Sequence, residues 1–168
     1  MAELIFVRHA EAELLKTTDA VRSLTEKGQK QSQRLSKIFL QELSLIELFI
    51  QSDLVRSQET LLGLLDAHVP SRILTTDTLY EKPPIELAKW LKKNASGLQK
   101  ILVVGHESQM SEFIGWGLAR SLEIEFEIKK AGVARLEIHD FSNILEQKLI
   151  LTELLSLKRM KELCRSVV

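Results

Sequence analysis

Two adjacent side chains near the amino terminus, Arg8 and His9, combine a cation with an imidazole. They directly follow the apolar run 4–7, a pattern typical of a strand that is buried on both faces of a sheet. In α/β sheets, ligands bind outside the carboxyl ends of the strands. The pair therefore suits chemistry on an anion, whereas the simpler interpretation is that it begins a solvated loop.

The same arrangement recurs after two later strand patterns, which favours the chemical interpretation. Ser52 and Arg56 follow the apolar run 48–50, and His106 follows 101–104, the strongest strand pattern in the chain. Because the carboxyl ends of parallel strands meet at one edge of a sheet, we expect two histidines and two arginines to converge there.

Such a set of side chains suits phosphoryl transfer. A guanidinium fork matches phosphate oxygens in bidentate fashion and stabilises the charge of the transition state. A neutral imidazole whose other nitrogen is held by a backbone carbonyl can attack phosphorus and form a covalent phosphohistidine intermediate. A second, charged imidazole would then steady the transferring group.

Strand patterns alternate with helical ones, which predicts one α/β domain over residues 1–168. Thr25 fits a helix N-cap, Gly28 an early turn where a backbone or ligand comes near, and Pro83-Pro84 the start of another helix. Helices are expected around Leu35, Leu61, Leu87 and Phe113, and at about 155–164. Strands are expected at 4–7, 48–50, 72–75, 101–104, 133–138 and 148–154, with the last two antiparallel. This order predicts a three-layer α/β/α sandwich with a mainly parallel central sheet and an antiparallel edge.

Four segments in order along the chain resemble the motifs of the histidine phosphatase superfamily, also called phosphoglycerate mutase-like. Residues 6–12 resemble its opening Arg-His-Gly motif, with Ala10 in place of glycine, and 24–29 resemble its leucine-threonine and glycine element. Residues 51–60 resemble its Ser-x-x-x-Arg-Ala-x-Gln-Thr helix start, with Ser57 for alanine and Glu59 for glutamine, and 103–107 resemble its second-histidine motif. The segment 130–136 is similar to the one that closes the sheet. The resemblance spans most of the chain and implies a phosphoglycerate mutase-like fold.

The resemblance also implies a role for each matching residue. His9 would be the phospho-acceptor nucleophile, Arg8 and Arg56 would clamp the phosphate, and Ser52 would bind substrate beside them. His106 would donate a hydrogen bond to the transferring group, the alternative being a satisfied buried histidine.

Other polar residues are assigned less firmly by their sequence context. Arg22 either contacts substrate or pairs with Asp19. His68 and His139 match no motif and fit solvated or capping positions.

Glu81 is the candidate proton donor for breaking a phosphomonoester, because it lies in the region where related enzymes place an acid. Its alternative role is a capping carboxylate ahead of the helix that begins with Pro83-Pro84. A substrate with a good leaving group needs no acid from the protein. Phosphohistidine is such a substrate, since its P–N bond is labile when the ring is protonated. In that case Glu11, which follows the nucleophile, could orient the site instead.

The short chain, with no long insertion to roof the pocket, most resembles the SixA-type phosphohistidine phosphatases. Their activity implies a phosphorylated signalling protein as the partner. The alternative is a phosphatase of small phosphomonoesters such as sugar or nucleotide phosphates. A third possibility is a non-catalytic phosphate-binding scaffold, although a scaffold would not need both imidazoles.

The composition restricts the classes of partner further. There are 23 basic residues (Lys and Arg) and 23 acidic residues (Asp and Glu), so no net field attracts nucleic acid or an anionic membrane. We expect a cytoplasmic protein without a membrane span or signal peptide, and the single Cys164 excludes an intramolecular disulfide. With four histidines and no close ligand cluster, no metal site and no cofactor are expected.

The basic segment 157–163 is amphipathic and either forms a solvated face or guides an acidic partner. The oligomeric state stays open.

Overall fold

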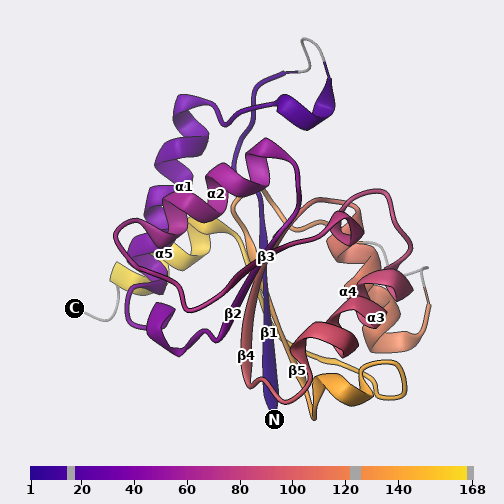
Figure 1. Ribbon diagram of the computed structural model, residues 1–168. Helices are drawn as coiled ribbons and strands as arrows, with labels where there is room; N and C mark the ends of the chain where they lie inside the picture. Colours follow the sequence, from indigo (N-terminus) through magenta and orange to yellow (C-terminus); the bar gives the residue numbers. More distant parts are fainter. Residues whose placement is uncertain (15–17, 122–125, 166–168) are drawn as a thin grey trace.

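A six-stranded sheet passes through the centre of the molecule in the order β3-β2-β4-β1-β5-β6 (Figure 1). The structure is a computed structural model that describes residues 1–14, 18–121 and 126–165. The strands are β1 (Ala2–Arg8), β2 (Leu48–Gln51), β3 (Ile73–Thr75), β4 (Lys100–Gly105), β5 (Val133–Ile138) and β6 (Ile150–Leu155). The first four are parallel, and β5 is antiparallel to both of its neighbours, β1 and β6. The predicted mainly parallel sheet with an antiparallel edge is confirmed.

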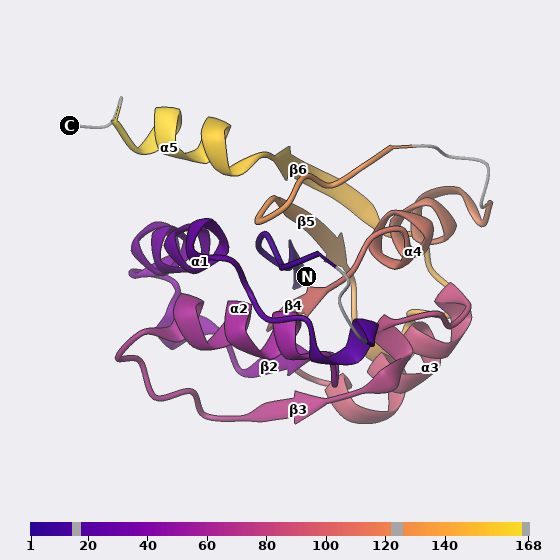
Figure 2. The ribbon, with the colours of Figure 1, turned by 90° about the horizontal axis from the view of Figure 1, so that it is seen from above.

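Helices cover both faces of the sheet, as the alternating sequence pattern predicts. They are α1 (Glu26–Phe39), α2 (Val55–Leu65), α3 (Pro84–Ala95), α4 (Gln109–Ala119) and α5 (Leu157–Arg165). Figure 1 shows α1, α2 and α5 on one face and α3 and α4 on the other. The view from above in Figure 2 shows α5 lying alongside α1. The α/β sandwich is therefore confirmed.

Side-chain alternation along β1 and β4 explains why these strands need cover on both faces. Leu4 and Phe6 pack into the core beneath α3 and α4, whereas Ile5 and Val7 pack into the core beneath α1 and α2. All four are fully buried. This continuous apolar run is what a central parallel strand requires.

Local signals place the beginnings of α1 and α3 where the sequence predicts them. The Thr25 side chain caps α1 by accepting a hydrogen bond from the Gly28 backbone N–H at 3.0 Å. Gly28 lies so close to the chain after β1 that an added Cβ would be 1.9 Å from the Glu11 carbonyl oxygen. Pro84 occupies the first turn of α3. The Gly28 contact joins α1 to the segment that follows His9.

Strand register brings three chain segments to one edge of the sheet. Arg8 at the end of β1 pairs with Gly105 at the end of β4, and Gln51 at the end of β2 pairs with Val104. The residues that follow these strand ends are therefore neighbours.

Within the described residues, no helix is long and apolar enough to cross a membrane.

Candidate active site

His9 lies directly after β1 with its ring buried and oriented by the backbone. Its Nδ1 is 2.7 Å from the carbonyl oxygen of Ala10, so Nδ1 carries the proton and Nε2 keeps its lone pair. Burial lowers the pKa of His9 to about 4, opposed by the Ala10 hydrogen bond and assisted by the positive charge of Arg56. At neutral pH the ring is therefore uncharged, and the lone pair on Nε2 is available.

His106 lies directly after β4 and faces His9, with 5.1 Å between the ring centroids. Its Nε2 is 2.5 Å from the Ser52 hydroxyl oxygen. Burial, together with the positive charges around it, lowers the pKa of His106 to about 2. The expectation of a charged second histidine thus differs from the structure, because water is excluded and two arginines are close. An arriving phosphate would supply the negative charge that favours protonation.

Three buried nitrogen atoms at this edge have no hydrogen-bond partner: Nε of Arg8, Nε of Arg56 and Nδ1 of His106. A buried polar group without a partner costs free energy, so such groups are rare in folded proteins. All three atoms can donate a hydrogen bond. Together with the two positive charges they fit an anion with several oxygen atoms, such as phosphate.

Arg56, in the first turn of α2, is almost fully buried and is held by Asp19. Its Nη2 is 2.7 Å from Asp19 Oδ2, and its Nη1 donates to the Asp19 carbonyl oxygen at 2.8 Å. Asp19 belongs to a short 3-10 helix, η1 (Asp19–Val21), and its other carboxylate oxygen is 2.7 Å from Arg22 Nη1. Burial alone would raise the pKa of Asp19, but hydrogen bonds from Arg22 and Arg56 hold it well below its usual range. Arg22 therefore pairs with Asp19, as one of its two predicted roles requires, while its contact with substrate stays a prediction.

Arg8 is anchored by the segment that precedes β5. Its Nη1 donates to the Ile128 carbonyl oxygen at 2.6 Å and lies 2.7 Å from Glu127 Oε1. The positive charge of Arg8 contributes to lowering the pKa of both site histidines. The Arg8 guanidinium is thus held through Nη1, while its Nε has no partner in the protein and is free to bind a ligand.

Tyr80 completes the rim on the side of α2 and α3. Its ring packs edge-on against His106 at 5.4 Å between centroids, and the Arg56 guanidinium lies 5.7 Å from the same ring. Hydrogen bonds to the carboxylates of Asp19 and Glu81 raise the pKa of Tyr80 to about 12. Glu81 itself is exposed, and its backbone N–H donates to Gln109 Oε1 at 2.9 Å. Glu81 therefore lies at the mouth of the site, beside Tyr80.

The predicted convergence of histidines and arginines at one sheet edge is confirmed, while their catalytic roles stay predictions. Ser52 is fully buried, and its hydroxyl is occupied by His106. Sequence reasoning missed Tyr80 and Glu127, and it considered Asp19 only as a partner for Arg22. The carboxylate at position 19, four residues upstream of the Ser23-Leu24-Thr25 stretch, had no local pattern that pointed to Arg56.

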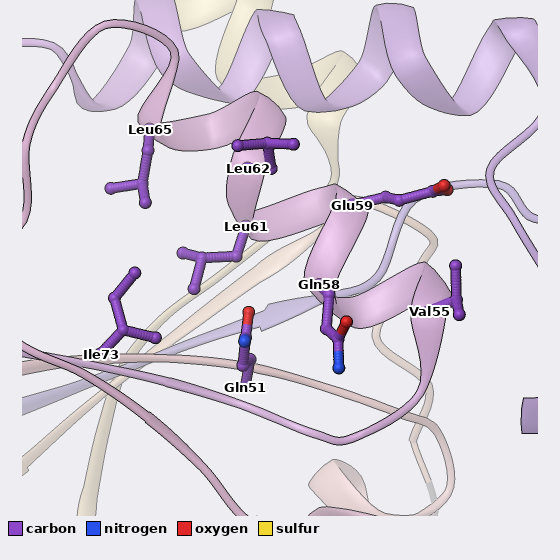
Figure 3. Close-up of a pocket in the computed structure, with 8 residues that line it drawn as sticks. All are labelled: Gln51, Val55, Gln58, Glu59, Leu61, Leu62, Leu65 and Ile73. Atoms are coloured by element: carbon purple, nitrogen blue, oxygen red, sulfur yellow. The ribbon is translucent and has the colours of Figure 1, made fainter.

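Other features of the described surface do not compete for this role. The hollow of about 450 Å³ in Figure 3 lies along α2 and is lined by eight residues, none of which is Lys, Arg or His. It is largely aliphatic, with Leu62 and Ile73 exposed. Among the described residues, no group of three or more His, Cys, Asp or Glu side chains is placed to hold a metal ion.

Comparison with known proteins identifies the fold. No family model and no curated protein sequence matched the chain. Among solved structures, it is similar to the protein histidine phosphatase SixA in complex with tungstate, at 19% identity and a TM-score of 0.76, covering 93% of this chain and 97% of that one. It is also similar to the α-ribazole phosphatase of Shigella flexneri, at 19% identity and a TM-score of 0.74, with 92% and 96% covered. A phosphoserine phosphatase of Entamoeba histolytica matches at 16% identity and a TM-score of 0.68, with 95% and 100% covered.

These likenesses extend over nearly the whole of each chain. The fold is therefore the one that these phosphatases share, as the sequence motifs predicted.

Proposed function

We propose that this protein is a phosphatase that works through a covalent phosphohistidine on His9 and acts on phosphohistidine in signalling proteins. The observation that carries the proposal is the pairing of an uncharged, oriented His9 with three unpartnered buried donors. A nucleophile and an oxyanion-binding set at one point are the two requirements of phosphoryl transfer.

The reaction proceeds in two displacements. The lone pair on His9 Nε2 forms a bond to phosphorus while the bond from phosphorus to the substrate nitrogen breaks. The substrate ring, protonated on its other nitrogen, leaves as neutral imidazole and keeps the electron pair of the broken bond. Water then attacks phosphorus while the bond from phosphorus to His9 Nε2 breaks and its electron pair returns to Nε2. The proton of the water passes to a phosphate oxygen, and inorganic phosphate leaves. Arg8, Arg56 and His106 stabilise the oxygens in both steps.

Two features support phosphohistidine as the substrate. The P–N bond needs no acid from the protein, and Glu81 is exposed at the mouth of the site with its backbone N–H bonded to Gln109. The chain between α2 and β4 holds only β3, a 3-10 helix over Asp77–Leu79 and α3, which leaves space for a protein substrate. The similarity to SixA points the same way.

The decisive experiment compares wild type with His9→Ala on a histidine-phosphorylated protein. We expect His9→Ala to lose turnover by at least a thousandfold, because the nucleophile is absent. The matched control is His139→Ala, which removes an exposed histidine and should retain wild-type turnover. Rapid quench of wild type should trap an acid-labile phosphate on His9. Full hydrolysis by His9→Ala would refute the mechanism.

A phosphatase of small phosphomonoesters is the second candidate, favoured by the likeness to the α-ribazole and phosphoserine phosphatases. An alkoxide leaving group requires a proton, and Glu81, whose carboxyl group is hydrogen-bonded to Tyr80 at the mouth of the site, is the candidate donor. If wild type hydrolyses phosphomonoesters but no phosphohistidine substrate, and Glu81→Gln abolishes that activity, the second candidate replaces the first.

A further inference from the structure

A basic groove begins beside the active site and extends between α1 and α5. It is a hollow of about 300 Å³ whose lining includes six cations, Lys27, Arg34, Lys129, Lys130, Lys158 and Lys161, and no Asp or Glu. A second basic hollow, lined by Lys30, Gln33, Arg34 and Lys37, continues it along α1. Because the whole chain has equal numbers of basic and acidic residues, this concentration of positive charge is local.

Backbone contacts connect the basic groove to the nucleophile. The residue after Lys130, Ala131, donates its N–H toward the carbonyl oxygens of Arg8 and His9 at 3.2 and 3.3 Å. The positive charge of Lys130 contributes to lowering the pKa of His9. Lys27, at the same end, lies 2.7 Å from the carboxylate of Glu11, two residues beyond His9. A molecule bound at His9 therefore lies next to the basic groove.

Much of the charge in the basic groove is not neutralised by the protein. Lys27 pairs with Glu11 and Lys129 pairs with Glu127. Among the described residues, Arg34, Lys158 and Lys161 form no ion pair, and neither does Lys130. Clustered like charges repel one another and favour unfolding, so an unneutralised cluster is better explained by a partner than by stability.

The dimensions of the groove indicate the size of that partner. Lys27 in the basic groove and Lys37 in the second hollow that continues it are ten residues apart on α1, which separates them by about 15 Å. A small phosphomonoester held at His9 cannot extend along such a distance. The acidic surface of a protein can, and it would also gain speed of association from the positive field.

We infer that the basic groove is a docking surface for the acidic face of the phosphoprotein substrate. The inference rests on the proposed function and adds to it the charge of the substrate protein. It also gives α5 a role, since Lys158 and Lys161 lie on the helix whose basic sequence left two interpretations open.

The test reverses charge in the groove without altering the reactive site. The groove variant carries Arg34→Glu, Lys158→Glu and Lys161→Glu. The control variant carries Arg72→Glu, Lys93→Glu and Lys148→Glu, three exposed cations outside the groove that form no ion pair in the described part of the chain. Both variants change the net charge equally. The substrates are a histidine-phosphorylated protein domain of net negative charge and free phosphohistidine.

At low salt, the groove variant should lose about tenfold or more in kcat/KM on the acidic domain, a loss that shrinks at high salt. Its kcat/KM on free phosphohistidine should stay within about twofold of wild type, which also shows that it is folded. The control variant should match wild type on both substrates.

An equal loss on free phosphohistidine, or an equal loss in the control variant, would overturn the docking surface. So would unchanged turnover of the acidic domain by a groove variant that has lost binding to vesicles of anionic lipid, because the groove would then serve a membrane. If wild type cleaves neither phosphohistidine substrate, the proposed function itself fails, which is a different result from the loss of docking.

Discussion

At the scale of single residues, the chemistry depends on which nitrogen of each histidine is free. His9 presents Nε2 because Ala10 holds Nδ1, and His106 presents Nδ1 because Ser52 holds Nε2. For an uncharged His106 to donate from Nδ1, its Nε2 must accept the Ser52 hydroxyl proton. We therefore propose that Ser52 positions His106, in place of the substrate contact expected from the sequence.

Replacing Ser52 tests this positioning role. Ser52→Ala should lower kcat by about tenfold to a hundredfold with little change in KM, because the His106 tautomer is no longer fixed. Ser52→Thr keeps the hydroxyl and should recover part of the activity. The exposed Ser71, whose hydroxyl bonds the Glu47 carbonyl, supplies the control Ser71→Ala. A rise in KM alone would indicate direct substrate contact by Ser52.

Site residues could be predicted where they follow a strand and missed where they do not. His9, Arg56 and His106 come after apolar runs whose carboxyl ends must meet, so their proximity follows from sheet geometry. Asp19 is separated from the end of β1 by ten residues, and Tyr80 is separated from the short, poorly buried β3 by a 3-10 helix, so each reaches Arg56 only through tertiary packing. Their part in the site is a property of the folded chain, which local patterns do not contain.

At the scale of elements, sequence patterns predicted all six strands, although β6 begins at Ile150, two residues later than expected. The difference arises in the connection from β5, where Asp140 caps a 3-10 helix over Phe141–Asn143 by accepting from the Ser142 N–H. The side chains of β6 are largely exposed, so burial does not define its boundary.

Gly28→Ala tests the close approach of α1. A Cβ would lie 1.9 Å from the Glu11 carbonyl oxygen, so either α1 or the segment after His9 must move. We expect a loss of about 2–3 kcal/mol in the free energy of unfolding and a reduced kcat, measured by urea denaturation and turnover. Gly97→Ala is the comparison: it meets no atom within 4 Å but has a φ of +82°, and it should cost about 1 kcal/mol without affecting kcat.

At the scale of the whole molecule, a second group of charges closes the opposite end of the sheet. Arg135 on β5 forms two contacts with the Glu42 carboxylate at 2.7 and 2.8 Å and one with Glu3 at 2.6 Å. Lys100, the first residue of β4, bridges the same two carboxylates. Glu3 is the second residue of β1 and Lys100 is the first residue of β4, and the other ends of both strands form the site. This charge network therefore lies far from the site residues.

Removing Arg135 should therefore separate stability from activity. Arg135→Ala removes the contacts with Glu42 and Glu3, which then keep Lys100 as their cation, and should cost about 2 kcal/mol in the free energy of unfolding. Its kcat, measured well below the melting temperature, should remain at the wild-type value. Arg159→Ala breaks an exposed pair with Glu162 and should change stability by less than about 0.5 kcal/mol. A large fall in kcat for folded Arg135→Ala would link the two ends of the sheet.

The site and this network should lose stability in different pH ranges. Folding lowers the pKa of His9 from 6.5 to about 4, so below pH 6.5 only the unfolded chain gains this proton and stability falls as pH falls. His106 acts in the same direction over a wider range. For Glu42, burial alone would raise the pKa, but hydrogen bonds from Arg135 and Lys100 lower it from 4.5 to about 2. Its contribution is therefore present above pH 4.5 and is lost below it.

Urea denaturation at stepped pH can separate the two ranges. In wild type the free energy of unfolding should fall from pH 6.5 downward, by up to about 1.4 kcal/mol per pH unit for each buried histidine. The His9→Asn/His106→Asn variant should be nearly flat between pH 6.5 and 4.5 and should still fall below pH 4.5, where Glu42 acts. His139→Asn removes an exposed ring and should keep the wild-type slope in both ranges. An unchanged slope above pH 4.5 in the double variant would mean that folding does not lower the pKa of the site histidines, and burial would then not be what keeps His9 uncharged.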